Sequence, residues 1–488
     1  MDIITAAKAA ELAGAELISG PAQNEVSKVV RDSRETVSGC LFVCLIGDTN
    51  NGHDYVEEAY ENGCRVFLIS SDKALEQLSK HEDVSILKVE NTHQAFYTMA
   101  ENYLAQFNLI KIAVTGSSGK TTTKDMLYSM LSSKYKTIKS YRNFNNDIGV
   151  SLTAFDVDHT TEVAIFEMGM NHAGEIHLLA KIVRPDIACI TNAGTAHIGN
   201  LGSRENILKA KMEVTDFMDE NSILVYNIDN DMLASLKDQN TPYKKLAVGY
   251  NADQDGVIMV VLNQAGEEGI VESSPSASGE EGITFIIRYN EDNMMFYLPV
   301  PGIYNASNAA VATGAALMVG MDLMDCSNAI MNVKLTDGRM SYMRSGEFKI
   351  LDDTYNANPD AVKVALDVLA GTFGRRRIAV LADMLDLGAA SEELHRETGE
   401  YAASKGINAL VTIGSDAAFI AEGAKEKNLD RETFSFKDHE EFEQRAKEIF
   451  RPGDAILVKG SHSMNMVSVV DFLKKLGSEI GREEQADE

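Results

Sequence analysis

Short, nearly uninterrupted apolar segments alternate with helical segments along most of this chain. In the middle of the sequence such segments occur at 109–116, 162–169, 186–194 and 222–229. Helical patterns fill the intervals between them. A strand that is apolar on both faces needs cover on both faces, which is typical of a parallel sheet enclosed by helices. The alternation therefore predicts an α/β fold with parallel sheets.

The alternation starts afresh in three places, which indicates three domains. A chain of 488 residues is longer than a single hydrophobic core usually serves. We expect a small N-terminal α/β domain over 1–104, a central parallel-sheet domain over 105–336 and a C-terminal open Rossmann-like α/β domain over 337–488. Between 251 and 300, apolar runs separated by polar Gly, Ser and Glu segments break the rhythm. They predict antiparallel strands carried by the central domain.

The net charge restricts the partners of the chain. Its 45 basic and 73 acidic residues give a formal net charge of −28, which argues against binding to nucleic acid or anionic membranes. A few local cations and backbone amides can nevertheless hold phosphates. The five cysteines are scattered and predict neither disulfides nor a zinc site. Because no signal peptide or membrane-spanning run is evident, we expect a cytoplasmic protein without membrane insertion.

The most specific local motif is TGSSGKTTTK at 115–124, between a predicted buried strand and a predicted helix. Its glycines allow a tight turn whose N–H groups face phosphate oxygens, and the helix N-terminus adds its dipole. The loop is shorter than the full GxxxxGK[ST] pattern. An ordinary turn of small residues is the alternative, but the position between strand and helix favours a phosphate site. The predicted phosphate-binding residues are Gly116, Ser117, Ser118, Gly119, Lys120, Thr121 and Thr122.

Two polar residues stand where the next strands end. Glu167 ends the apolar run VAIF, and His197 follows the strand after it. A buried carboxylate is costly unless it is paired or bound to a metal, and open α/β sheets bind ligands at the carboxyl ends of their strands. A lone histidine is more often structural. Together with Lys120 on a neighbouring strand, however, the pair favours Mg²⁺ or phosphate binding.

Two further segments are dense in polar side chains, NFNNDIGVS at 143–151 and DDTYNANPDA at 352–361. The first suits a hydrogen-bonding loop. The second places two carboxylates at a strand end and Pro359 at the first turn of a predicted helix. Turn chemistry explains either segment taken alone, because Asn, Asp, Gly and Pro all favour turns.

In this order, the motifs of the chain resemble those of the Mur ligase superfamily over nearly its whole length. Within it, DDTYNANP and ADMLDLGAASEELH, at 382–395, favour the MurF-type branch, the UDP-N-acetylmuramoyl-tripeptide–D-alanyl-D-alanine ligases. The segment at 32–55 is similar to the uridine-nucleotide-binding domain of that branch. The motifs that carry the resemblance are TGSSGKTTTK, NFNNDIG, EMGMNHAGEI, TNAGTAHIGNLGSRENILKAK, GIYNASNAAVA, DGRM and DDTYNANPDA.

The resemblance implies an ATP-dependent ligase that joins D-alanyl-D-alanine to UDP-N-acetylmuramoyl-tripeptide through an acyl phosphate, in peptidoglycan precursor synthesis. It implies that 1–104 binds the UDP substrate, that 105–336 is a P-loop-like ATPase domain, and that 337–488 binds the incoming dipeptide. ATP and Mg²⁺, with two metal ions expected, would be the cofactors. We expect a monomer.

The resemblance also implies roles for the residues that match its motifs. Thr121 and Glu167 would bind one Mg²⁺, and His197 would bind or support the second. Lys211 matches a lysine that is carbamylated in many members; the alternative is a solvated helix lysine. The other expected contacts are Asn305, Asn308, Arg339 and Asp353 with the nucleotide, Ser33 and Arg34 with the uridine diphosphate, Asn145 and Asn146 with the muramoyl peptide, and Tyr355, Asn356 and Asn358 with substrate.

Two positions depart from the family pattern. Ser151 stands where proline is common, and His462 stands where arginine is common. These two departures leave the contacts with the incoming acceptor undetermined. One alternative is a Mur-type ligase that adds another amino acid; the uridine-domain signature argues against a folylpolyglutamate or cyanophycin-type enzyme. The other is a P-loop regulatory protein without ligation, which has no need for a third domain carrying DDTYNANP.

Overall fold

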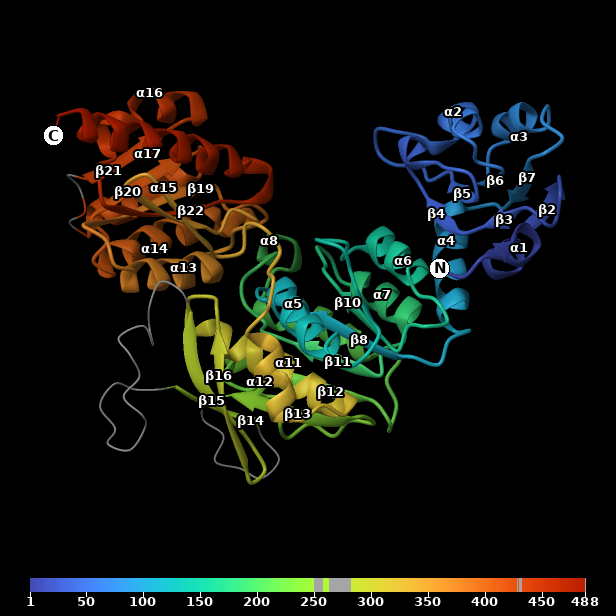
Figure 1. The fold of residues 1–488 in the computed structure, drawn as a ribbon, viewed down its shortest axis with the longest axis horizontal. Helices are drawn as coiled ribbons and strands as arrows, with labels where there is room; N and C mark the ends of the chain where they lie inside the picture. The colour runs from blue at the N-terminus through green and yellow to red at the C-terminus, as the bar shows by residue number, and fades with distance from the viewer. Residues whose placement is uncertain (250–257, 263–281, 428, 430–431, 488) are drawn as a thin grey trace.

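Three large sheets follow one another along the chain, each with its own helices (Figure 1). The structure is a computed structural model that describes residues 1–249, 258–262, 282–427, 429 and 432–487. The first and last groups of elements lie on opposite sides of the middle one (Figure 1). The architecture is α/β with mainly parallel sheets, and the predicted fold class is confirmed.

The first group is built on a five-stranded sheet with the strand order β2-β7-β6-β5-β4. The strands from β7 to β4 are parallel, and β2 pairs antiparallel with β7. Strands β1 and β3 form a separate antiparallel pair. The elements are β1 (Ile4–Thr5), α1 (Ala6–Ala13), β2 (Glu16–Ser19), β3 (Glu25–Val26), β4 (Lys28–Val30), η1 (Ser33–Glu35), β5 (Cys40–Val43), η2 (Gly52–Tyr55), α2 (Val56–Glu61), β6 (Val66–Ile69), α3 (Asp72–Leu78), β7 (Ser85–Lys88) and α4 (Thr92–Leu104).

The middle group contains a nine-stranded sheet with the order β16-β15-β14-β13-β12-β11-β8-β10-β9. The strands from β9 to β14 are parallel, and β15 and β16 extend the sheet antiparallel. The antiparallel strands predicted between 251 and 300 are thus confirmed, whereas the acidic stretch at 263–281 lies outside the described residues.

The elements of the middle group are β8 (Ile110–Thr115), α5 (Lys120–Leu131), β9 (Thr137–Lys139), α6 (Asp147–Phe155), β10 (Val163–Glu167), α7 (Glu175–Val183), β11 (Ile187–Ile190), α8 (Ile198–Leu201), α9 (Arg204–Met212), η3 (Glu213–Thr215), β12 (Ile223–Asn227), α10 (Asp231–Ala234), β13 (Lys244–Gly249), β14 (Ile258–Leu262), β15 (Ile283–Tyr289), β16 (Asp292–Leu298), α11 (Tyr304–Val319) and α12 (Leu323–Ile330).

The last group has a six-stranded sheet with the order β17-β18-β22-β19-β20-β21, in which only the edge strand β17 is antiparallel. The elements are β17 (Ser341–Ser345), β18 (Phe348–Asp352), α13 (Pro359–Gly371), β19 (Arg376–Ala382), η5 (Gly388–Ala390), α14 (Ser391–Ser404), β20 (Ala409–Ile413), α15 (Ala417–Glu426), β21 (Thr433–Phe436), α16 (His439–Ile449), β22 (Asp454–Lys459), η7 (His462–Met464) and α17 (Val467–Asp487).

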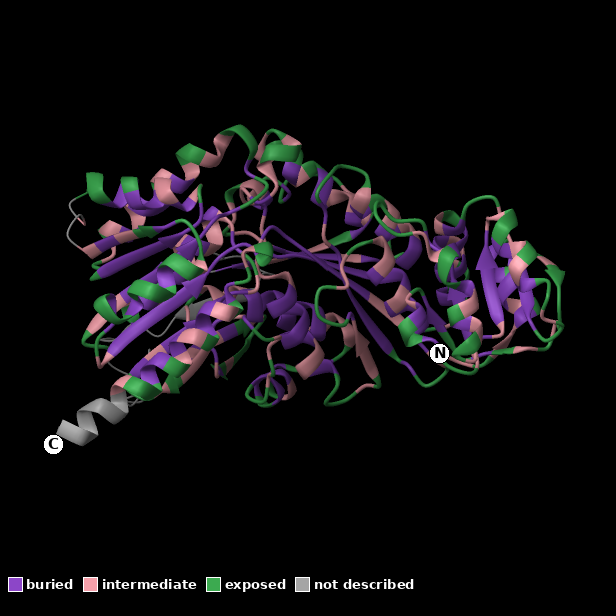
Figure 2. Cartoon of the chain, turned by 90° about the horizontal axis from the view of Figure 1, so that it is seen from above, coloured by how far each residue is buried: buried purple, intermediate pink, exposed green. Residues whose placement is uncertain are grey.

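Helices cover both faces of the middle sheet, as the continuous apolar strands predict. On one face α5, α11 and α12 enclose a core that includes Leu127, Ala309 and Ile330. On the other face α6, α7 and α9 enclose a core that continues into the first group of elements, where α4 packs on α6 and α7. Figure 2 shows the strands as buried segments between helices with exposed outer surfaces. Within the described residues, no helix is long and apolar enough to cross a membrane.

The carboxyl ends of two sets of strands bring polar loops together. In the middle sheet β11, β8 and β10 are neighbours, and in the last sheet β18 and β22 are parallel neighbours. The loops that follow these five strands line one common cavity. The candidate site therefore lies between the middle and last sheets, where ligands of open α/β sheets bind.

Candidate functional site

The predicted phosphate loop connects β8 to α5, and its backbone requires glycine at two positions. Gly116 has φ +151° and Gly119 has φ +80°, values that other residues rarely adopt. A Cβ on Gly116 would also lie 1.9 Å from Thr191 Oγ1, and a Cβ on Gly119 would lie 2.4 Å from Asn308 Oδ1. The loop is therefore tightly packed against β11 and α11.

Asn192, which directly follows Thr191 at the end of β11, holds the loop in place. Its Oδ1 accepts a hydrogen bond from Ser118 N at 2.9 Å, and its Nδ2 donates to Ser118 Oγ at 2.6 Å. Its backbone oxygen accepts from Ser117 N at 3.1 Å. Asn192 was not identified from the sequence. Its position at the end of a predicted strand, next to that of the phosphate loop, could have indicated its role.

A cavity of about 160 Å³ lies beside the phosphate loop. Inside it, Asn305 donates through Nδ2 to Pro301 O at 2.8 Å and accepts from Asn308 Nδ2 at 3.2 Å, so the two amides are fixed relative to each other. The cavity brings together most of the predicted nucleotide residues. Those that line it are Ser118, Gly119, Thr122, Asn305, Asn308, Arg339 and Asp353.

A second cavity, of about 480 Å³, lies between the middle and last sheets. Arg339 lines both cavities, so the two adjoin at its side chain. Predicted catalytic and substrate residues from both sheets meet in the second cavity. They are Ser117, Lys120, Asn145, Asn146, Glu167, His197, Tyr355, Asn356 and Asn358.

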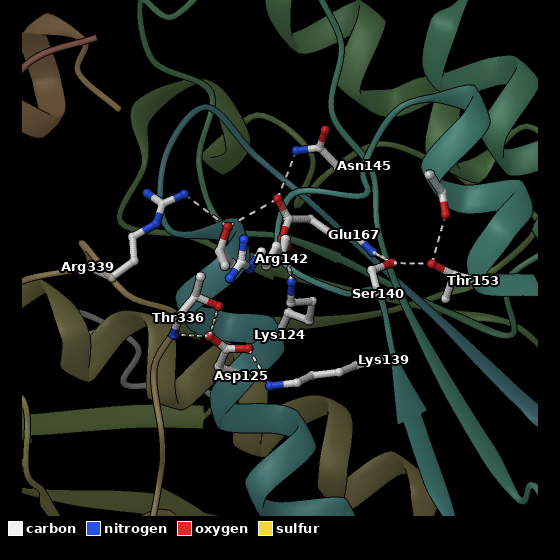
Figure 3. Close-up of polar contacts among 12 residues, drawn as sticks. Lys124, Asp125, Lys139, Ser140, Arg142, Asn145, Thr153, Glu167, Thr336 and Arg339 are labelled. Atoms are coloured by element: carbon white, nitrogen blue, oxygen red, sulfur yellow. Dashed lines mark hydrogen bonds and ion pairs between the residues drawn. The ribbon is translucent and has the colours of Figure 1, made fainter. Parts of the chain in front are cut away.

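Glu167 is the centre of a buried polar cluster at the end of β10 (Figure 3). Its side chain is 1% exposed. Oε1 accepts from Thr121 Oγ1 at 3.1 Å and from Asn145 Nδ2 at 3.0 Å, and Oε2 lies 3.0 Å from Lys124 Nζ. Burial raises the pKa of the Glu167 carboxyl, but the charges of Lys124 and Lys120 outweigh it and hold this pKa below its ordinary value. Glu167 is therefore a carboxylate.

Lys124 was not among the residues we singled out from the sequence. It lies on α5 one turn after Lys120, is fully buried, and also donates to Arg142 O at 2.7 Å. It thereby connects Glu167 to the loop that carries Asn145. The available signal was a lysine on the buried face of a helix, which requires an anionic partner.

The cluster fits a magnesium ion better than a transition metal. Thr121 and Glu167 offer a hydroxyl and a carboxylate oxygen within 3.1 Å of each other. Mg²⁺ is usually held by one or two protein oxygens together with phosphates and water. The described residues contain no group of three or more His, Cys, Asp or Glu that could hold a metal by themselves. Phosphate oxygens or water would therefore have to supply the remaining ligands of an ion held here.

His197 precedes α8 with a positive φ of 64°. Its Nδ1 lies 3.5 Å from Asp386 Oδ2, across the boundary between the two sheets. Burial, with the charges of Lys120 and Lys211, lowers the pKa of His197 to about 4. The imidazole is therefore neutral near neutral pH, the state in which histidine binds metals.

Lys211 lies on α9 and is buried, with 2% of the residue exposed. Among the described residues it has no hydrogen-bond or ion-pair partner. Burial, together with the charge of Lys120, lowers the pKa of Lys211 well below its ordinary value. The alternative that Lys211 is a solvated surface lysine is wrong.

Arg339 reaches from the segment before β17 to the phosphate loop. Its Nη2 donates to Thr121 Oγ1 at 3.0 Å, and its guanidinium lies 3.7 Å from the centre of the Tyr355 ring. Asp353, at the end of β18, accepts from Met340 N at 3.2 Å and pairs with Lys459 Nζ at 2.5 Å. Lys459 also lines the smaller cavity, beside the phosphate loop, and was not predicted.

Two of the predicted substrate residues also have local structural duties. The Asn146 side chain accepts from Gly149 N and caps α6, and the Asn358 side chain accepts from Ala361 N and caps α13. The turn chemistry that we kept open as an alternative is therefore present at both positions. Both residues nevertheless line the cavity between the sheets.

The structure does not bring Ser33 and Arg34 to the phosphate loop. Both lie in η1 of the first group of elements, and neither lines either cavity. Ser33 Oγ donates to Glu58 Oε2 at 2.8 Å, and Arg34 pairs with Asp32 at 2.5 Å. The Arg34 side chain is 82% exposed, so it is accessible to a ligand at that end of the molecule.

Matches to known proteins cover most of the chain. Family models match at residues 25–104 (Mur ligase family, catalytic domain), 114–316 (Mur ligase middle domain) and 338–462 (Mur ligase, glutamate ligase domain). The UDP-N-acetylmuramoyl-tripeptide–D-alanyl-D-alanine ligase of Bacillus subtilis is 32% identical over 468 residues, 94% of this chain and 97% of the relative. The Escherichia coli ligase of the same name is 31% identical over 473 residues, 96% of each chain.

Solved structures agree with the sequence comparison. MurF from Acinetobacter baumannii superposes with a TM-score of 0.86 at 27% identity, covering 97% of this chain and 99% of that one. MurF ligase from Thermotoga maritima in complex with ADP superposes with a TM-score of 0.76 at 25% identity, covering 93% and 98%.

Proposed function

The chain belongs to the Mur ligase family, as its sequence predicts, and from that membership we propose that it is a MurF-type ligase that uses ATP to join D-alanyl-D-alanine to UDP-N-acetylmuramoyl-tripeptide. The observation that carries the proposal is the pair of adjoining cavities with Arg339 in common. A nucleotide in the smaller cavity would present its terminal phosphate to the larger one. That geometry suits phosphoryl transfer to a second substrate, and it argues against the alternative of a purely regulatory protein.

We assign the smaller cavity to ATP. Its position over the phosphate loop and the ADP bound to the Thermotoga maritima relative both support this assignment. The loop from Gly116 to Thr122, with Lys120, would hold the β- and γ-phosphates. Asn305 and Asn308 would contact the nucleotide, Asp353 its ribose, and Arg339 its γ-phosphate.

We assign Mg²⁺ to Thr121 and Glu167, with His197 at a second ion. When bound, the ions would neutralise phosphate charge during transfer. Lys124 would keep Glu167 ionised and fixed in place for this duty. Asp386 Oδ2 lies 3.5 Å from the buried His197 Nδ1 without a hydrogen bond, so Asp386 would restrict the His197 ring by its proximity alone.

The reaction would proceed in two balanced steps. An oxygen of the terminal carboxylate of the tripeptide attacks the γ-phosphorus, the bond to ADP breaks, and an acyl phosphate forms. The amine of D-alanyl-D-alanine then attacks the acyl carbon, an amide forms, and phosphate and a proton leave. Such chemistry needs alignment and charge stabilisation rather than a reactive side chain. Lys120 and Arg339 would supply the positive charge.

The three groups of elements would divide the substrates among them. We assign the UDP moiety to 1–104 with Ser33 and Arg34, and the incoming dipeptide to 337–488. The central domain, 105–336, would perform the phosphoryl transfer. We further propose that the protein acts in the cytoplasm as a monomer. Within the larger cavity, Asn145 and Asn146 would contact the muramoyl peptide, and Tyr355, Asn356 and Asn358 would contact substrate.

The choice of acceptor tests this proposal. With ATP, Mg²⁺ and UDP-N-acetylmuramoyl-tripeptide, we expect phosphate release to depend on D-alanyl-D-alanine and to be far slower with L-lysine, diaminopimelate or D-glutamate. Omission of the tripeptide should abolish the release and serves as the control. A preference for any single amino acid would place the chain in another branch of the family.

A further inference from the structure

Asp125 is a buried carboxylate on α5 to which the proposed reaction assigns no role. It lies one helical turn after Thr121 and is 1% exposed. Its Oδ1 pairs with Lys139 Nζ at 2.6 Å, and its Oδ2 accepts from Thr336 N at 2.8 Å and from Thr336 Oγ1 at 2.9 Å (Figure 3). Lys139 balances the buried charge, and the other oxygen holds Thr336.

Thr336 belongs to the segment 331–340, which connects α12 to β17 and is called the linker below. Three residues further on, Arg339 donates to Thr121 Oγ1 at 3.0 Å. Thr121 and Asp125 are four residues apart on α5 and so lie on the same face of the helix. The linker is therefore attached to the phosphate-loop helix at two points, one turn apart.

The linker is also bonded to the last group of elements. Gly338 O accepts from Tyr355 N at 3.1 Å, and the Arg339 guanidinium stacks on the Tyr355 ring. Gly338 has φ +71°, and a Cβ there would lie 3.1 Å from Tyr355 N, so this turn is tight. The backbone that leads to Arg339 is thus held by Asp125 on one side and by Tyr355 on the other.

We propose that Asp125 is a positioning residue that anchors the linker to α5 and thereby sets where the Arg339 guanidinium meets the transferring phosphate. The proposal rests on the γ-phosphate role given to Arg339 above. Arginine has a long side chain with many rotamers, so a fixed main chain is needed to aim it. A carboxylate is well suited to this anchoring, because its hydrogen bonds are stronger than those of neutral acceptors.

Amide hydrogen exchange tests the anchor without reference to catalysis. The Thr336 amide donates to Asp125, so exchange in the linker should become faster in Asp125→Ala and in the milder Thr336→Val. Lys139→Arg is the matched control, since it alters the other partner of the same carboxylate but keeps the balancing charge and the linker bonds. Linker exchange that is unchanged in Asp125→Ala, or that is equally fast in Lys139→Arg, overturns the proposal.

A double-mutant cycle on kcat tests the consequence. Asp125→Ala should lower kcat about 10-fold, since displacement of a catalytic group by a fraction of an ångström is costly. Thr336→Val should lower kcat less, and Lys139→Arg should stay close to the unsubstituted chain. In an Arg339→Ala background, Asp125→Ala should cause no further loss. Additive losses would show that Asp125 acts only on general stability.

The two measurements separate this proposal from the proposed function. If Arg339→Ala alone retains normal kcat, the γ-phosphate role of Arg339 fails, whereas hydrogen exchange still decides whether Asp125 anchors the linker. If Arg339→Ala is impaired and the cycle is additive, the role of Arg339 stands and the positioning role of Asp125 fails.

Discussion

Lys120→Ala is expected to lower kcat by about 100-fold or more, because it removes an electrostatic contact to the transferring phosphoryl group. Lys120 begins α5 and lines the cavity between the sheets, where its Nζ donates to Gly116 O at 2.7 Å. Its ammonium is therefore already oriented along the phosphate loop. Burial, assisted by Arg339 and opposed by Glu167, lowers the pKa of Lys120 to about 8, so an anionic phosphate is a favourable partner for it.

Steady-state phosphate release with saturating substrates measures the effect, and thermal unfolding checks that the variant remains folded. Lys134→Ala is the matched control. It removes a lysine just beyond the opposite end of α5, about 20 Å away at the helical rise per residue, where the side chain is 45% exposed. Near-normal turnover in Lys120→Ala would remove the phosphate loop from the mechanism.

Lys211 lines neither of the two cavities. Lys211→Ala is nevertheless expected to reduce ligation by about 100-fold, because we place its carbamylated form at the metal site, where loss of a charged group is costly. A buried ammonium that is repelled by the charge of Lys120 and has no anionic partner among the described residues is unfavourable. The lowered pKa of Lys211 favours the neutral amine, which can add to carbon dioxide and release a proton. We propose that the resulting carbamate supplies the negative charge that the metal site needs.

Chemical rescue distinguishes this role from a packing role. Acetate or formate should partly restore ligation by Lys211→Ala, since a small carboxylate can occupy the space of the carbamate. Lys209→Ala, an exposed lysine two residues earlier on α9, is the control and should act normally. A fully active Lys211→Ala, or an unmodified amine in a crystal structure with Mg²⁺ bound, contradicts the carbamate.

The parts of the site that depend on local sequence could be predicted from it. Gly116 and Gly119 follow a buried strand and precede a helix, and this pattern alone indicates a phosphate loop. Glu167 was predicted because a carboxylate at the end of an apolar strand needs a partner. The antiparallel strands near 283–298 followed from a change in the spacing of apolar runs.

Contacts between distant segments could not be predicted in this way. The pairing of Asp125 with Thr336 joins residues 211 positions apart and depends on how the linker crosses α5. Thr195, likewise, donates to Asp360 across the boundary between the two sheets. Neither carboxylate differs from an ordinary helix acid in its local sequence. Asp125 gains Thr336 from the path of the linker across α5, and Asp360 gains Thr195 from the packing of the last sheet against the middle one.

The fate of the carboxylate oxygens tests the central claim most directly. UDP-N-acetylmuramoyl-tripeptide labelled with oxygen-18 in its terminal carboxylate would be incubated with the protein, ATP, Mg²⁺ and D-alanyl-D-alanine. Mass spectrometry of the released phosphate and of the peptide product then follows the label. We predict that each phosphate carries one labelled oxygen and that the product contains the new amide bond. Unlabelled phosphate, or phosphate release without amide formation, would contradict ligation through an acyl phosphate.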